Sequence, residues 1–230
     1  MALVRPLRLL LLGAPGSGKG TLTSRLLKQF PTISSLSSGD ILRSQLSSGT
    51  TLSHEISSYI KEGKLLPDKL MVRLIGGELD KRNWLNKQST WLLDGFPRTV
   101  GQARSLDQVL KPNEASINMV VELDVDQKVI IDRIEARWVH VNSGRVYNLD
   151  YNPPKVPFKD DITGEPLTKR DDDTAEVVSK RLDLYNKELQ PLKQFYQELN
   201  VLHTVSGNTS DIVYPQLAQL VIDNYSHINN

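Results

Sequence analysis

Residues 13–21 read Gly-Ala-Pro-Gly-Ser-Gly-Lys-Gly-Thr, and they directly follow the apolar run Leu7–Leu12. A buried strand, a glycine-rich loop and a helix in this order are typical of a phosphate-binding loop. Glycines let successive backbone N–H groups converge on phosphate oxygens, while the helix N-terminus and Lys19 add positive charge. The stretch therefore predicts a nucleoside triphosphate site. The alternative is a glycine-rich turn with only a structural role. One position departs from the general pattern, because Gly20 follows Lys19 and the hydroxyl comes one place later, at Thr21.

The composition excludes several classes of protein. The chain has 230 residues with 28 basic and 27 acidic side chains, so no net field recruits nucleic acid or an anionic membrane. Cysteine is absent, which excludes disulfides and thiolate metal sites and fits a reducing compartment. The longest apolar run, Leu9–Leu12, is too short to span a bilayer. We expect no nucleic-acid or membrane partner, and a monomer.

The N-terminal region leaves the compartment open. The first expected strand begins near Leu7, which leaves no room for a cleavable targeting peptide. Residues 1–39 contain basic side chains and no acidic one, a pattern that an uncleaved organelle signal would share with a phosphate-binding region.

Short apolar runs alternate with amphipathic stretches, which favours an α/β fold with a parallel sheet flanked by helices. Five strands are expected: Leu7–Leu12, Thr32–Leu36, Thr90–Leu93, Asn118–Leu123 and Val201–Val205. The expected helices are Gly20–Phe30, Asp40–Ser47, Ser53–Lys61, Asp68–Asn83, Gln102–Leu110, Gln127–Arg137, Thr174–Leu199 and Ile212–Tyr225.

Two insertions interrupt this alternation. Residues 138–173 are rich in Gly, Pro and Asn with Val and Tyr between them, which predicts a small, hairpin-like appendage with little core of its own. Residues 37–66 are helical and rich in serine. Both could be ordinary surface loops, but insertions of this length in compact domains are usually functional, so we expect lids. The core domain then comprises residues 1–36, 67–137 and 174–230.

A second candidate site follows the third expected strand. Trp91-Leu-Leu-Asp94-Gly-Phe-Pro-Arg98 is a buried strand that ends in an acid, followed by a tight turn that delivers an arginine. An acid at this position beside a phosphate-binding loop can hold Mg²⁺ through water, although it could also simply cap a helix. Further arginines lie at the ends of elements rather than along solvent faces: Arg43, Arg133, Arg137, Arg170 and Arg181.

At these residues the chain resembles the adenylate kinase family of nucleoside monophosphate kinases. The resemblance covers about Leu7 to Ser210 and includes five stretches in the family's order. These are the phosphate-binding loop with its Lys-Gly-Thr variant, Leu-Ser-Ser-Gly-Asp-Ile-Leu-Arg (36–43), Asp-Gly-Phe-Pro-Arg (94–98), Ser-Gly-Arg-Val-Tyr (143–147) and Asp-Ile-Thr-Gly-Glu (161–165). Trp138, Asn148 and Pro166 are most similar to the mitochondrial branch that uses GTP as the donor, in a fungal form.

The resemblance implies a phosphoryl transfer from a nucleoside triphosphate (GTP or ITP, with ATP as the alternative) to AMP, with Mg²⁺ beside Asp94. It implies triphosphate contacts at Gly16, Ser17, Gly18, Lys19, Gly20, Thr21, Arg137, Val146 and Tyr147. It makes residues 37–66 the AMP-binding insertion, and AMP contacts fall on Ser38, Arg43, Lys64, Leu65, Leu66, Gly95, Phe96, Pro97, Arg98, Gln102, Arg170 and Arg181. The catalytic set is Lys19, Arg98, Arg133, Arg137, Arg170 and Arg181. The mitochondrial matrix follows from the resemblance, with the cytoplasm as the alternative.

Four lid residues, His140, Ser143, Asp160 and Thr163, have the spacing at which some family members place four zinc-binding cysteines. Because hydroxyls are poor zinc ligands, we expect no zinc here. A hydrogen-bonded substitute is expected instead, in which Asp160 accepts hydrogen bonds from His140 and from the two hydroxyls.

Other functions stay open from the residues alone. A phosphate-loop switch or motor ATPase would need a water-orienting residue and an extended partner surface, and neither is legible. A nucleotide-binding module without catalysis would be favoured by the loss of one of the arginines, yet every matched position is filled. Kinases of sugars or shikimate are the nearest enzymatic alternative, and the segment Leu36–Arg43 argues against them.

Overall fold

The computed structural model describes residues 2–226 and has a five-stranded parallel sheet at its centre. The strands lie in the order β2-β3-β1-β4-β7, and every neighbouring pair is parallel. Their bounds are β1 Arg8–Gly13, β2 Ser34–Ser37, β3 Trp91–Asp94, β4 Met119–Asp124 and β7 Leu202–Ser206. The expected α/β fold with a five-stranded parallel sheet is therefore confirmed.

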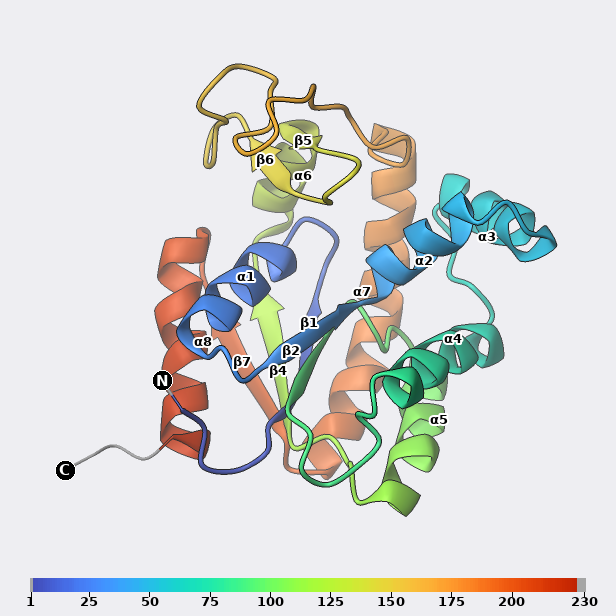
Figure 1. The fold of residues 1–230 in the computed structure, drawn as a ribbon, viewed down its shortest axis with the longest axis vertical. Helices are drawn as coiled ribbons and strands as arrows, with labels where there is room; N and C mark the ends of the chain where they lie inside the picture. Colours follow the sequence, from blue (N-terminus) through green and yellow to red (C-terminus); the bar gives the residue numbers. More distant parts are fainter. Residues whose placement is uncertain (1, 227–230) are drawn as a thin grey trace.

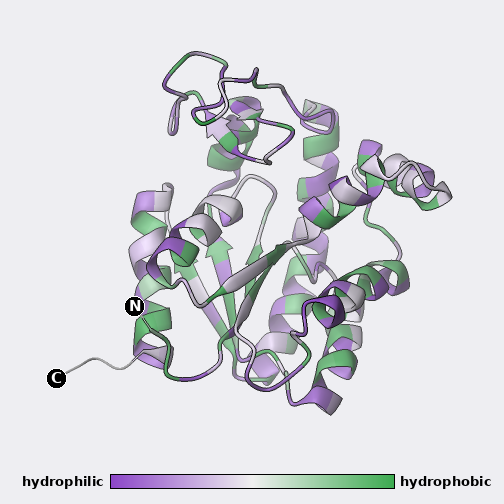
Figure 2. Ribbon diagram, viewed as in Figure 1, coloured by the Kyte–Doolittle hydropathy of each residue, from purple (hydrophilic) through white to green (hydrophobic). Residues whose placement is uncertain are grey.

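Helices cover both faces of this sheet (Figure 1). They are α1 Lys19–Gln29, α2 Ser38–Ser47, α3 Thr51–Lys61, α4 Asp68–Lys81, α5 Val100–Leu110, α6 Gln127–Glu135, α7 Ala175–Glu198 and α8 Ser210–Tyr225, with a short 3₁₀ turn at Lys111–Asn113. None of the described helices is long and apolar enough to cross a membrane. In Figure 2 the strands carry long hydrophobic stretches, whereas the helices mix hydrophobic and hydrophilic residues.

The leucines of β1 show why the chain folds in layers. Leu10 and Leu12 point into a core formed with α4, α5 and α7, whereas Leu9 and Leu11 point into a core formed with α1 and α8. Side chains alternate across a strand, so a continuous apolar run can serve two cores only when both faces are covered. The two cores hold the phosphate-binding loop on a rigid sheet.

The carboxyl ends of three strands meet at one edge of the sheet. Leu11 lies opposite Asp94 in the pairing of β1 with β3, and Ser37 lies opposite Asp94 in the pairing of β2 with β3. β1 runs directly into the phosphate-binding loop, and β2 runs directly into α2. This edge therefore brings the loop, Asp94 and the start of α2 together.

The two insertions emerge above this edge. Residues 37–66 form α2 and α3, and Thr50 caps α3 in a reciprocal capping box with Ser53. In the second insertion, β5 (Arg137–Val139) and β6 (Val146–Asn148) form an antiparallel pair, and isolated bridges tie in the following loops. Figure 1 shows this segment at the top, next to α6 and the upper end of α7.

The expected helix Gln127–Arg137 is too long by two residues. α6 ends at Glu135, and Arg137 begins β5, where it pairs with Asn148. The alternation of apolar residues continues smoothly through this junction, so periodicity did not reveal the change from helix to strand. The other elements differ from expectation by no more than two residues at either end.

Candidate nucleotide site

The phosphate-binding loop leads directly into the N-terminus of α1. Gly18 precedes α1 in a left-handed conformation, its N-cap position offers no side-chain hydrogen bond, and no acidic residue lies in the first turn. The first N–H groups of a helix need an external acceptor, and an anion is the natural one. Gly16 has φ +82°, and a Cβ placed there would lie 2.7 Å from Cγ1 of Ile134. This position therefore requires glycine both for its conformation and for its packing on α6.

Ser17 and Lys19 complete the loop. The Ser17 hydroxyl is buried and has no partner within the described chain, which is costly unless a ligand supplies one. The Lys19 ammonium donates to the carbonyls of Gly13 and Ala14, at 2.8 and 2.9 Å. Burial lowers the pKa of Lys19 to about 8, and nearby Asp94 opposes that shift. Both groups suit an anionic ligand, because it would accept hydrogen bonds from each.

Asp94 lies at the end of β3, within electrostatic range of Lys19 and Arg98. Desolvation raises the pKa of Asp94, and the two cations oppose that rise. The alternative role of helix cap is wrong, because Thr99 caps α5 by accepting from the N–H of Gln102. A single carboxylate beside a phosphate-binding loop matches the way Mg²⁺ is bound, through few protein ligands and retained water.

The turn after Asp94 is held by its own hydrogen bonds. Ser38 donates to the carbonyl of Gly95 at 2.8 Å, and Nε of Arg98 donates to the same carbonyl at 2.8 Å. The buried amide of Gln102 accepts from the N–H of Arg98 at 2.8 Å. Four of the expected AMP contacts are thus one hydrogen-bonded unit, which fixes where the Arg98 side chain begins.

The arginines from distant segments influence one another electrostatically. Desolvation, together with the nearby guanidinium groups of Arg137 and Arg43, lowers the pKa of Arg170 to about 10. Desolvation likewise lowers the pKa of Arg98, with a further contribution from Arg181. Several cations held this close together make a strongly positive site, which an anion of high charge would relieve.

Carboxylates partly balance this charge. Asp173, with a side chain 2% exposed, forms a two-point ion pair with Arg137, with Nε to Oδ2 at 2.8 Å. Asp172 pairs with Arg181, and Asp40 pairs with Arg43. The sequence alone does not predict which arginine each of these acids contacts. Because each carboxylate contacts a guanidinium that the resemblance assigns to phosphate, a phosphate must compete with it.

Arg133 joins the loop to the far side of the site. Its guanidinium donates to the carbonyls of Gly16, at 3.4 Å, and Asn208, at 3.1 Å, and it lies over the ring of Tyr151. Desolvation lowers the pKa of Arg133. This side chain is therefore positioned at the phosphate-binding loop.

The structure directs several expected contact side chains elsewhere. Leu66 and Phe96 pack in the core, and Lys64 points to Glu62 at 2.6 Å on the surface. Tyr147 is buried in the lid, where its hydroxyl donates to Asp160 at 2.9 Å and accepts from the N–H of Asp161. For Leu66, Phe96 and Tyr147, contact with a nucleotide would fall to the backbone.

The lid cluster differs from the expected one. Asp160 accepts from Thr163 at 3.0 Å, but its strongest partner is Arg145, at 2.7 and 2.6 Å, which was not expected. These donors hold the pKa of Asp160 far below its usual range.

The expected bonds from His140 and Ser143 to Asp160 are wrong. The His140 ring lies between Ser143, at 2.7 Å, and Glu165, and its Nδ1 stays 3.8 Å from Asp160. The physical reason is that Arg145 and Tyr147 already occupy the carboxylate, which leaves Glu165 to face the ring.

Comparison with known proteins shows which family this chain resembles. A family model described as adenylate kinase matches residues 11–201. A mitochondrial GTP:AMP phosphotransferase of Saccharomyces cerevisiae is 61% identical over 223 residues, covering 97% of this chain and 95% of the relative. An adenylate kinase of Vanderwaltozyma polyspora is 44% identical over 195 residues, covering 85% of this chain and 86% of the relative. A mitochondrial GTP:AMP phosphotransferase of Drosophila melanogaster is 38% identical over 216 residues, covering 94% and 95%.

The fold and the site thus define a phosphate-loop kinase of small acceptors. The chain belongs to the adenylate kinase family, whose members are nucleoside monophosphate kinases. Its substrates are accordingly a nucleoside triphosphate and a nucleoside monophosphate.

Proposed function

We propose that this chain transfers the terminal phosphoryl group of GTP reversibly to AMP, giving GDP and ADP, as a monomer in the mitochondrial matrix. The observation that carries the proposal is the electrostatic contact among Lys19, Asp94 and arginines from separate segments: Arg43, Arg98, Arg137, Arg170 and Arg181. The donor base and the compartment rest on the names of the yeast and fly relatives.

The residues divide between two phosphate groups. Gly16 to Thr21 and Lys19 would hold the donor phosphates, with Arg133 and Arg137 on the lid side. Ser38, Gly95 and Arg98 would hold AMP on the side of Asp94 away from the donor phosphates, together with Arg43. Phosphoryl transfer needs little covalent chemistry from the protein, so positioning and charge neutralisation supply most of the rate.

Arg170 and Arg181 would neutralise the phosphoryl group in transit. Arginine suits this role because its planar fork matches two phosphate oxygens at once. Asp172 and Asp173 would hold Arg181 and Arg137 in orientation and release them to phosphate. Mg²⁺, which Asp94 would hold through water, supplies further neutralisation of the phosphate oxygens when bound.

The lid, residues 138–173, and the AMP-binding insertion, residues 37–66, would exclude water from the site. Without such exclusion, water would compete with AMP as the acceptor and the triphosphate would be hydrolysed. Arg170 lies near the end of the lid segment. Its pKa is lowered by the charges of Arg137, on the lid side, and of Arg43, in the AMP-binding insertion. This position suits a residue that closes only when both substrates are present.

Initial rates with GTP, ITP and ATP, each against AMP, test the donor. We expect kcat/KM for GTP or ITP to exceed that for ATP. A higher value for ATP would favour the second candidate, an ATP:AMP adenylate kinase, which the 44% identity to a relative named adenylate kinase supports. Triphosphate hydrolysis without phosphorylation of AMP would exclude both kinases and favour a phosphate-loop NTPase.

A further inference from the structure

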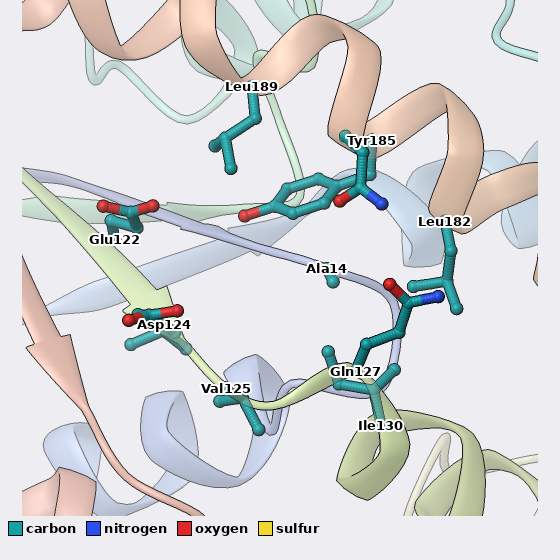
Figure 3. A pocket seen from close by; sticks show the side chains of 11 residues that line it. Ala14, Glu122, Asp124, Val125, Gln127, Ile130, Leu182, Tyr185 and Leu189 are labelled. Atoms are coloured by element: carbon teal, nitrogen blue, oxygen red, sulfur yellow. The ribbon is translucent and has the colours of Figure 1, made fainter.

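Acidic side chains beside the sheet contact different parts of the molecule. Glu122 and Asp124 border a pocket between β4, α6 and α7 (Figure 3). The Glu122 carboxylate pairs with Lys193 of α7, at 2.8 Å. Asp124 accepts a hydrogen bond from Ser206 of β7, at 3.4 Å. These two acids therefore join β4 to its own neighbours. Asp68 is different, because it contacts the helix that follows the turn at 94–98.

Asp68 lies where the AMP-binding insertion returns to the core. It is the first residue of α4, directly after Pro67 and two residues after Leu66. Its two carboxylate oxygens accept from the Thr99 hydroxyl, at 3.1 and 3.0 Å. A Cβ added at Gly101 would lie 2.4 Å from Oδ2 of Asp68, so the carboxylate packs directly on the first turn of α5. That turn contains no acid of its own, and a negative charge is favourable at a helix N-terminus.

The Asp68 carboxylate fixes the direction of the Thr99 hydroxyl. A hydroxyl has one proton and an ionised carboxylate only accepts, so the Thr99 proton points to Asp68. The lone pairs of the same oxygen then face the backbone N–H of Gln102, which donates to it at 3.0 Å. Without the carboxylate the hydroxyl is free to rotate, and the cap that it provides for α5 becomes weaker.

Gln102 extends this series to Arg98. Its side chain is buried, and its amide oxygen accepts from the backbone N–H of Arg98 at 2.8 Å. The Arg98 guanidinium in turn donates to the carbonyl of Gly95 at 2.8 Å. A series of hydrogen bonds thus runs from Asp68 through Thr99 and Gln102 to the turn at 94–98.

We propose that Asp68 is a positioning residue for the acceptor nucleotide. It holds Gln102 and the Arg98 guanidinium in place relative to the end of the AMP-binding insertion, and it acts through the Thr99 hydroxyl. The inference rests on the proposed function, which assigns Gln102 and Arg98 to AMP. The phosphate-binding loop joins β1 to α1 and lies outside this series, so the donor site does not depend on Asp68.

Asp68→Asn provides the first test, because it keeps the size of the side chain and removes its charge and one acceptor oxygen. We expect the Kd of AMP, measured by calorimetry on the full chain, to rise about tenfold, the effect of losing one hydrogen bond to a charged group. The Kd of a non-hydrolysable GTP analogue should stay unchanged, which also shows that the variant folds. Asp80→Asn, at an exposed acid near the other end of α4, is the matched control and should change neither constant.

Thr99 provides the second test. Thr99→Val removes the hydroxyl at nearly the same shape and should weaken AMP binding, whereas Thr99→Ser keeps the hydroxyl and should restore it. If Asp68 acts through this hydroxyl, then adding Asp68→Asn to Thr99→Val should weaken AMP binding no further, because residues that act in one series are not additive.

The outcomes separate this inference from the function on which it rests. An unaltered chain that does not bind AMP would overturn both. If the unaltered chain binds AMP, the inference alone is overturned by unchanged AMP binding in Asp68→Asn, by an equal loss of AMP and GTP-analogue binding, or by additive losses in the double variant.

Discussion

At the scale of single residues, the sequence makes both Lys19 and Arg98 candidates, and the structure shows what holds each side chain in place. The sequence motif identifies Lys19, and the strand and turn before Arg98 make that arginine a candidate. The structure adds that the Arg98 backbone N–H donates to Gln102 and its guanidinium donates to the carbonyl of Gly95. Both side chains lie close enough to Asp94 for their charges to lower the pKa of its carboxyl group. Predictions about charge and phosphate binding belong at this scale.

Binding of the donor should weaken as the pH rises through about 8. Lys19 has a pKa of about 8 in the ligand-free chain, and only its charged form attracts phosphate. Above that pH the group must first take up a proton, so the Kd of a non-hydrolysable GTP analogue should be about tenfold higher at pH 9 than at pH 7. Calorimetric titration across this range measures the effect. Lys19→Arg, which stays charged, should flatten the profile, and an unchanged slope in that variant would contradict the assignment.

Removing the Arg98 guanidinium should remove catalysis and leave the fold. We expect Arg98→Ala to lower kcat about 10²–10³-fold, the size of effect seen when one preorganised charge donor is lost. Arg104→Ala is the control and should keep full activity. Arg104 is an exposed residue of α5, and its guanidinium lies over the ring of Phe195 in α7. Steady-state rates together with the thermal midpoint distinguish the two variants. Wild-type turnover in Arg98→Ala would exclude Arg98 from the site.

At the scale of elements, the lid shows how a segment without a core of its own becomes ordered. Its buried Asp160 gathers donors from Arg145, Tyr147 and Thr163, so that charge and hydrogen bonds replace apolar packing. The turn at 140–145 repeats in the turn at 160–165: in each, a glycine N–H donates to the carbonyl four residues earlier, at 2.9 Å. His140 and Asp160 begin these two turns, and Nδ1 of His140 lies 3.8 Å from the Asp160 carboxylate.

Loss of the Arg145 side chain should loosen the lid and spare the core. Arg145→Ala leaves the buried Asp160 carboxylate without its main partner, which is unfavourable in a site with little access to water. Hydrogen exchange should accelerate at least tenfold within residues 138–173 and stay unchanged in β1 and β4. Lys155→Ala, at an exposed lid lysine, serves as the control. Equal acceleration in sheet and lid would mean that the cluster stabilises the whole molecule instead.

At the scale of the whole molecule, two insertions on opposite sides of one sheet edge must act together. Arg170 is the link, because its pKa responds to Arg137 on the lid side and to Arg43 on the insertion side. Since the rest of the site is fixed on the sheet, closure of these two segments is the motion that the proposed chemistry requires.

A bisubstrate dinucleoside polyphosphate should bring the lid and the insertion together. The chain has no cysteine, so Lys155→Cys with Ser58→Cys gives two unique positions for a fluorescent pair. We expect transfer efficiency to rise when the bisubstrate ligand binds and to rise less with GTP or AMP alone. Arg170→Ala should reduce the response to the bisubstrate ligand. An efficiency that does not change with any ligand would argue against closure.

The sequence by itself determined the phosphate-binding loop and the order of strands and helices along the chain, whereas the limits of the two insertions remain a prediction. These features follow from local patterns, because the spacing of glycines and the periodicity of apolar residues act over a turn or a strand. It also indicated Asp94 as the acid beside the loop, since a parallel sheet brings the carboxyl ends of its strands to one edge.

Only the tertiary structure decided which charges meet. The pairing of Arg137 with Asp173, of Arg181 with Asp172 and of His140 with Glu165 joins side chains from separate segments. The chain has several arginines and several acids that could form many different ion pairs. No pattern in the sequence distinguishes one set of pairs from another. The choice is made by packing and desolvation, which depend on the folded arrangement and not on neighbours in sequence.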